Sequence, residues 1–419
     1  MYAERMVCLF SFAFRRGEYG VSPPVRPGNG KCPGSVMRDR GGLERAGLPP
    51  CGRQIHVRRG HSRSRYCDPV YRQDESALSL LTIHGDQNMN RRDFLKAAAC
   101  AAAGAFFVRG MPHEPVAHGQ EAARDASPAP GATVYMTRNI SPAGLMAIYR
   151  ALGRTMAGKV AVKLTVGEPG GRNFLSPNLI GELVTSVKGT FVDSNTAYGG
   201  RRATARDHLQ AAGDHGFLAL APMDILDEEG EISLPIQGGS HLRDVRVGSH
   251  FSAYDSMMVL THFKGHAMAG FGGALKNIAI GIASRTGKCL VHTAGKSSTN
   301  AFAPVRQEHF LEAMAEAAEG MIRAMGAQNM AYINVMNRLS VDCDCDSHPA
   351  EPELPDIGIL ASLDPVALDR ACVDLVYAAD HQKSASLRQR MESLNGTHVL
   401  THAERLGIGN QRYTLVGID

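Results

Sequence analysis

An acidic segment with two closely spaced cysteines, VDCDCDSHPAEPELPD at residues 341–356, carries side chains that could ligate a metal. Cys343 and Cys345 alternate there with Asp342, Asp344 and Asp346. Adjacent carboxylates raise thiol pKa values, whereas a bound cation stabilises thiolate and carboxylate together. A Cys-x-Cys pair in an irregular segment can direct both sulfurs to one metal, and joining the pair to each other would close a small, strained ring. The spacing therefore predicts a metal site, with a solvated acidic loop or a disulfide to a distant cysteine as the alternatives.

Four cysteines lie beyond residue 120: Cys289, Cys343, Cys345 and Cys372. Cys372 is in step with apolar residues of an expected helix, and Cys289 sits beside an apolar run, so each is interpreted as a core residue. Four thiols could hold one iron–sulfur cluster if the fold brings them together, although the close spacing of ferredoxins is absent. Either residue could instead form a disulfide with one cysteine of the Cys-x-Cys pair.

The glycine-rich segment THFKGHAMAGFGGALKN, residues 261–277, is a second candidate for binding or catalysis. It follows an apolar run that ends at Phe263, and glycines placed after a strand let backbone N–H groups approach a ligand. In an open α/β sheet, ligands bind at this edge. The alternative is a tight strand-to-helix connection with exposed polar side chains. The candidate residues are Lys264, His266 and Lys276 for catalysis, and Gly270, Gly272, Gly273, Asn277 and, from a third segment, Asn195 for cofactor binding.

That third segment, FVDSNTAYGGRRATARDH at 191–208, delivers Asp193 and Asn195 to the same kind of strand edge. Arg201 and Arg202 fall in the first turn of the helix expected from residue 201, where positive charge opposes the helix dipole. They either serve an anionic ligand or form a solvated face. Lys163 lies in the middle of another apolar run, which is costly unless its charge is paired or belongs to a site.

The elements that must position these residues follow from the apolar patterns. Strands are expected at 160–166, 190–195, 256–263, 331–341 and 356–363, with a β-rich stretch over 231–248. Helices are expected at 176–187, 201–216, 305–325 and from Asp364-Pro365 to about residue 377, marked by caps, prolines, a closing glycine or one apolar face. Residues 275–284 fit a helix or a strand. The alternation predicts an α/β fold with a mostly parallel or mixed sheet covered by helices, and a ligand cleft at the strand ends.

Three ordered blocks resemble the domain-of-unknown-function 362 family: DSNTAYGGRRATARDHL (193–209), HFKGHAMAGFGGALKNIAIGIASRTGK (262–288) and the stretch from Cys343 to Tyr377. The resemblance runs from about Val160 to Tyr377 and implies that the glycine-loop histidines and the Cys-x-Cys pair are the family's signature polar positions. Many relatives carry an inserted two-cluster ferredoxin module after the segment equivalent to GKCLVHT. Here AGKSSTNAFAPVRQ, without a cysteine, occupies that place. The iron–sulfur label of those relatives therefore does not transfer through this segment.

An export signal is expected before this domain. MNRRDFLKAAACAAAGAFFV, from Met89, joins Arg91-Arg92 to a short apolar run, which is typical of a twin-arginine signal and too short to span a bilayer. Residues 1–88 are arginine-rich without periodicity and are predicted to be a mis-assigned or disordered leader, with a genuine basic arm as the alternative. The signal region is placed at 89–120, a linker at 121–132 and a single α/β domain at 133–419.

The net charge of +4 belongs to the first part of the chain. Residues 1–120 are net basic and the rest is net acidic, so the argument for a nucleic-acid or anionic-membrane partner disappears from the domain. No further segment is long and apolar enough for a stable membrane span.

Together these features predict an exported, periplasmic protein that depends on a metal ion or an iron–sulfur cluster and acts as a redox enzyme on a small anionic molecule. The metal ligands would be Cys343, Cys345, His262 and His266, while Lys264 and Lys276 would hold the anion. Its partners would be that anionic ligand, the twin-arginine export machinery and a redox partner. The alternative is a protein that binds a metal or metallocofactor without catalysis.

Overall fold

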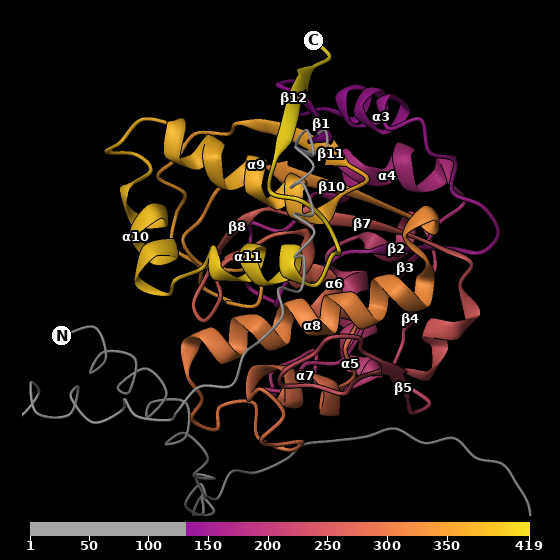
Figure 1. Cartoon of the computed structure of the whole chain (residues 1–419). Helices are drawn as coiled ribbons and strands as arrows, with labels where there is room; N and C mark the ends of the chain where they lie inside the picture. The colour runs from indigo at the N-terminus through magenta and orange to yellow at the C-terminus, as the bar shows by residue number, and fades with distance from the viewer. Residues whose placement is uncertain (1–130) are drawn as a thin grey trace, which may run out of the picture. The chain divides into compact units, whose positions relative to one another are not determined.

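The structure is a computed structural model that describes residues 131–419 (Figure 1). The expected leader, the twin-arginine segment and almost all of the expected linker lie outside these residues. None of the described helices is long and apolar enough to cross a membrane.

An eight-stranded sheet forms the centre of the described fold (Figure 1). In spatial order its strands are β12 (Tyr413–Gly417), β1 (Ala132–Thr137), β11 (Gly358–Ser362), β10 (Met330–Met336), β7 (Ser256–His262), β2 (Val160–Lys163), β3 (Thr190–Asp193) and β4 (Met223–Ile225). Strand β11 runs antiparallel to both of its neighbours, and all the other pairs in this sheet are parallel. The predicted mostly parallel α/β fold is confirmed.

Helices cover both faces of the sheet (Figure 1). α3 (Pro142–Ala151) and α4 (Pro177–Ser186) contribute to the core on one face, while α6 (Ala274–Ile282), α8 (Gln307–Met325), α9 (Pro365–Ala378) and α11 (His398–Arg405) contribute to the core on the other. Successive residues of a strand therefore enter different cores: Met257 and Val259 of β7 join the α6–α8 side, and Met258 and Leu260 join the α3–α4 side. A sheet buried on both faces explains why its strands have continuous apolar runs.

The remaining elements surround this sheet. They are α5 (Ala205–Asp214), α7 (Arg285–His292), α10 (Ala385–Ser393), the hairpin of β5 (Glu231–Pro235) with β6 (Asp244–Gly248), and the hairpin of β8 (Lys264–His266) with β9 (Gly270–Gly272). Three short 3-10 turns lie at Phe217–Ala219, Ser249–Ala253 and Ala327–Asn329.

Local signals placed two of the helices well. The Asp364 carboxylate accepts hydrogen bonds from the N–H groups of Val366 and Ala367 at the start of α9, as a capping residue before Pro365 should. The expected apolar face of α8 is buried along its whole length, from Phe310 to Met325.

The start of α5 differs from expectation. The helix begins at Ala205 because the Thr204 hydroxyl caps it, accepting a hydrogen bond from the Asp207 N–H group. Arg201 and Arg202 therefore precede the helix, so neither opposes its dipole from the first turn.

The parallel strands bring polar residues to one edge of the sheet. β2, β3, β7 and β10 run in the same direction, so Lys163, Asp193 and His262, the last residues of three of them, lie at their carboxyl ends. The chain leaves β2 toward β3 on one side, while β7 pairs with β2 on the other. Such a switch point is where open α/β sheets bind ligands.

The opposite end of the sheet joins the two ends of the domain. β12 pairs in parallel with β1, from Ala132 opposite Tyr413 to Met136 opposite Gly417. Beyond β12, the Asp419 carboxylate accepts hydrogen bonds from the Thr137 hydroxyl and from the Arg138 N–H group.

Candidate functional site

The glycine-rich segment and the cysteine-rich segment meet at the β8–β9 hairpin. Gly265 allows this contact, because a Cβ atom there would lie 2.1 Å from the Val341 carbonyl oxygen. The Gly265 N–H group donates a hydrogen bond of 2.8 Å to the Ser340 carbonyl, which ties the two segments together. Two stretches predicted separately from the sequence therefore lie in contact with each other.

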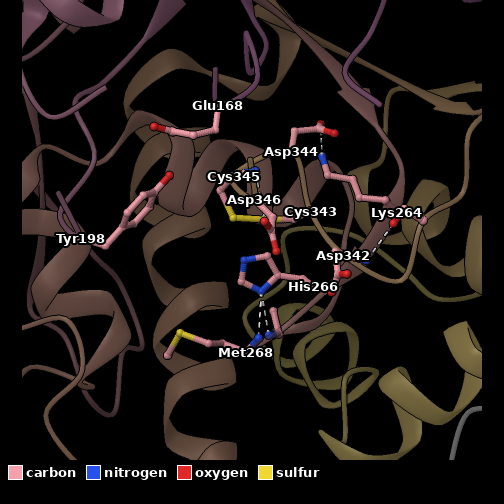
Figure 2. The surroundings of a disulfide bond; sticks show 12 residues. Glu168, Tyr198, Lys264, His266, Met268, Asp342, Cys343, Asp344, Cys345 and Asp346 are labelled. Carbon is pink, nitrogen blue, oxygen red and sulfur yellow. Dashed lines mark hydrogen bonds and ion pairs between the residues drawn. A yellow bond between two sulfur atoms is a disulfide. The ribbon is translucent and has the colours of Figure 1, made fainter. Parts of the chain in front are cut away.

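The donor atoms of His266, Cys343 and Cys345 lie within 4.8 Å of one another (Figure 2). The two cysteines form a disulfide with each other, contrary to the expectation that such a small ring would not close. Cys289 and Cys372, the distant partners considered from the sequence, are free and buried. Once reduced, the pair would offer two thiolates beside one imidazole.

The hydrogen bonds of His266 fix its tautomer. Its Nδ1 accepts from the backbone N–H groups of Met268 and Ala269, at 3.1 and 3.0 Å. The proton of the neutral ring is therefore on Nε2, which lies on the ring edge that faces the sulfurs (Figure 2). Burial, together with Lys276 nearby, holds the pKa of His266 well below its usual value, so the ring is neutral.

Asp344, between the two cysteines in sequence, anchors their loop. Its buried carboxylate lies 2.9 Å from His262 Nδ1 and 3.1 Å from Lys264 Nζ. Burial opposes ionisation, but His262 and Lys264 outweigh it and hold the pKa of Asp344 well below its usual range. His262 Nε2 contacts the Asn337 carbonyl at 2.7 Å. Both ring nitrogens of His262 thus face acceptors, and the structure does not bring this residue into the metal set.

The other carboxylates of the loop also have polar partners. Asp342 forms an ion pair with Arg390 at 3.4 Å, and Asp346 accepts a hydrogen bond from the His348 N–H group. The Cys345 N–H group donates a hydrogen bond to Cys343 Sγ at 3.3 Å.

The Lys276 ammonium has no hydrogen bond or ion pair with any residue in the described part of the chain, although the side chain is half-buried in the first turn of α6. Burial, Lys264 and Lys163 lower the pKa of its ammonium to about 7. A Cβ atom at Gly272 would lie 3.4 Å from Lys264 Cε and 3.7 Å from Lys276 Cδ, so this glycine leaves room for both lysines. The sequence-predicted lysines are therefore neighbours, one paired and one unpaired.

A family model described as a domain of unknown function, DUF362, matches residues 160–374. The chain belongs to the DUF362 family. This agrees with the resemblance of the sequence blocks, and the matched residues include His266, Cys343, Cys345 and Lys276.

Solved structures similar to this DUF362 chain are distant. The lactate racemase apoprotein from Thermoanaerobacterium thermosaccharolyticum is 14% identical, with a TM-score of 0.34, and the match covers 59% of this chain and 57% of that one. A structural-genomics protein from Thermotoga maritima is 15% identical, with a TM-score of 0.35, covering 55% and 57%. The chain therefore spans little more than half the length of either protein. A comparison with curated proteins gives no match.

A second buried ion cluster of the DUF362 chain lies at the ends of β2 and β3. Lys163 Nζ lies 3.1 Å from the Asp193 carboxylate and donates to Asn277 Oδ1 at 2.9 Å. Arg202 is buried rather than solvated, because it pairs with Glu168 at 2.8 Å. The Glu168 N–H group donates to the Asp344 carbonyl, which joins this cluster to the cysteine loop.

The residues expected to bind a cofactor mostly have structural contacts. Asp369 accepts hydrogen bonds from the N–H groups of Ala274 and Leu275, so the start of α6 is already capped and is not an open anion site. Gly273 makes room for that carboxylate. Gly270 packs against the backbone of Gly396, and the Asn277 amide donates hydrogen bonds to the Leu260 carbonyl and the Thr261 hydroxyl. Asn195 differs, because its buried Oδ1 has no partner among the described residues.

Sequence reasoning missed His292 of α7. Burial, with Lys276 nearby, lowers the pKa of His292 to about 4, and Nδ1 contacts the Lys288 carbonyl at 2.7 Å. It also lowers the pKa of His266, which places it beside the site. The segment GKCLVHT drew attention to its cysteine, and nothing local marked the histidine three residues later.

Proposed function

We propose that this protein is an exported, metal-dependent enzyme, with a redox role, that acts on a small anionic substrate. Reduced Cys343 and Cys345, with His266, would hold the metal, and Lys276 would receive the anion. The observation that carries the proposal is the convergence of these three donors within 4.8 Å, from two separate segments, beside an ammonium without a partner.

The donor set fits a borderline or soft transition metal. Two thiolates and an imidazole suit zinc, copper(I), iron or nickel, whereas magnesium and calcium prefer oxygen ligands. Such a metal would polarise an oxygen of the bound anion. A cluster held by four cysteines does not fit, because Cys289 and Cys372 lie outside the donor group among the described residues.

Loading the site requires reduction of the disulfide. Two equivalents of an external thiol would reduce the Cys343–Cys345 disulfide to two thiols and be oxidised to their own disulfide, and metal binding would then displace the two thiol protons. To ligate the metal through Nε2, His266 would have to carry its proton on Nδ1, and Nδ1 would then give up the hydrogen bonds that it accepts from the Met268 and Ala269 N–H groups.

Lys276 suits the anion because its pKa of about 7 leaves it partly charged near neutral pH. In the charged form it attracts a carboxylate or a similar group, and in the neutral form it can accept a proton. Lys264 is less suited, because it already pairs with Asp344 and donates to the His262 carbonyl at 2.7 Å.

The tautomer of His266 favours a second candidate, a dithiol–disulfide redox centre without metal. The Nε2–H group faces the sulfurs and can donate a hydrogen bond to a thiolate as it forms. An external thiol would attack one sulfur, the Cys343–Cys345 bond would break, and a second thiol would complete the two-electron reduction.

Metal analysis of the full chain, purified under reducing and anaerobic conditions, separates these functions. We expect about one transition metal per chain, lost in Cys343→Ser and His266→Ala and retained in the control His348→Ala, an exposed histidine of the same loop. If the protein holds the metal but turns over no small anion, the function is metal binding without catalysis. If the protein holds no metal and its two thiols are oxidised and reduced reversibly, the dithiol–disulfide centre is the remaining function.

Export is a separate part of the proposal and rests on the twin-arginine pattern. Replacing Arg91 and Arg92 by lysine should keep the protein out of the periplasmic fraction, as measured by immunoblotting. Unchanged export of the double variant would remove this part alone.

A further inference from the structure

We propose that His241, His309 and Glu312 form a second cation site, of nitrogen and oxygen ligands, that takes a divalent transition metal such as zinc, nickel or cobalt. Their donor atoms lie within 4.8 Å of one another, and all three side chains are half-buried. The set shares no residue with the cysteine site.

Three elements converge to build this site. His309 and Glu312 are three residues apart on α8, which places them on one helix face. His241 comes from the connection between β5 and β6, and its Nε2 lies 2.6 Å from the Glu312 carboxylate. His398, at the start of α11, contacts the other Glu312 oxygen at 2.9 Å, and is the nearest candidate for a fourth ligand.

His309 is the observation that points beyond a simple hydrogen-bonded network. Its ring packs against that of His241, with centroids 4.6 Å apart, and neither ring nitrogen bonds to any residue in the described range. The neutral His309 ring therefore has a nitrogen lone pair that no described residue uses. Because a second imidazole and a carboxylate lie beside it, this lone pair is available to ligate a metal.

The loop that carries His241 is held in place by a separate residue. Glu316, one turn further along α8, is fully buried and accepts hydrogen bonds from the backbone N–H groups of Ser240, His241 and Leu242. Supporting contacts of this kind orient metal ligands in advance. The donors are imidazole and carboxylate, which favour zinc, nickel or cobalt over calcium and magnesium.

Cobalt binding to the oxidised full chain tests the proposal. With the Cys343–Cys345 disulfide intact the thiolate site is closed, and none of the ligands of the second site is a cysteine. This site would therefore bind cobalt with weak d–d absorption and without a thiolate charge-transfer band. We expect saturation at one equivalent and affinity weakened roughly tenfold or more in His309→Ala. The control is His381→Ala, an exposed histidine outside the cluster, which should bind as the wild type does.

His309→Ala is the decisive variant because it removes no hydrogen bond, so loss of folding would not explain lost binding. Binding unchanged in this variant, or no saturation at a large excess of metal, would overturn the site and leave only a His–Glu network. Zinc should also raise the Tm of the wild type by about 5 °C at 100-fold excess over Kd, because it joins three elements of the folded state. Failure here leaves the thiolate site untouched, since that site is measured in the reduced protein.

Discussion

Replacing Asp344 by asparagine tests the buried ion cluster that Asp344 forms with His262 and Lys264. At the observed 3.1 Å, the attraction between Asp344 and Lys264 is roughly 5 kcal/mol at an effective dielectric constant of about 20. The variant would leave a buried ammonium without its counter-ion, which typically costs about 3–5 kcal/mol. In a domain of this size the corresponding fall in Tm is about 10 °C.

The matched control is Asp342→Asn, two residues away in the same loop. Its partner Arg390 is 3.4 Å away and both side chains are a quarter exposed, so this change should cost about 1 kcal/mol or less. Urea denaturation of the wild type and both variants measures the two free energies of unfolding. Equal losses in the two variants would refute the assignment of Asp344 as the anchor of the loop.

The pH dependence of the same experiment gives a second check. The folded-state pKa of Asp344 is lowered, so its contribution is present above the unfolded pKa of about 3.9 and is lost as pH falls toward the folded value. The gap between wild type and Asp344→Asn should therefore stay constant from about pH 7 to about pH 5. A gap that closes within that range would mean that the carboxylate is not ionised there.

Three further outcomes are expected. Gly273→Ala should lower the free energy of unfolding, measured in urea, by about 2–4 kcal/mol, since its Cβ would lie 2.3 Å from a buried carboxylate. Gly272→Ala, whose Cβ would lie 3.4 Å from a lysine stem, should lower it by about 1 kcal/mol or less. Equal losses would contradict this packing. Arg202→Met should destabilise by about 3 kcal/mol or more and the exposed Arg201→Met by less than about 0.5, measured in the same way; no difference between them would deny the buried pair. Sulfate affinity, measured by calorimetry, should fall as pH rises through about 7, because Lys276 loses its proton. Lys276→Met should abolish this pH dependence. If the pH dependence persists in the variant, another group causes it.

Local chemistry predicted the elements of this fold and part of its site. The capping of α9 by Asp364 and the apolar face of α8 depend on neighbours within a few residues, so the sequence reveals them directly. The convergence of His266 with Cys343 and Cys345 followed from both segments lying at one edge of a parallel sheet.

Contacts between distant segments were beyond the sequence. Arg202 looked like a poor first-turn residue until Glu168 was seen beside it, and His262 could not be separated from His266 without the partners of their ring nitrogens. The cluster around Glu312 joins three segments, of which only α8 brings two candidate ligands, His309 and Glu312, close together in the sequence. Such sites depend on tertiary packing, which periodicity does not encode.

The pairing of β12 with β1 has a consequence for biosynthesis. β1 is the first of the described strands to leave the ribosome, but its outer edge is covered only by residues 413–417, about 280 positions later. Until then its unpaired N–H and C=O groups can pair with other chains. Emergence of residues 413–417, rather than of the helices, therefore completes the described sheet, and a nascent chain stalled before residue 413 would leave this edge open to aggregation.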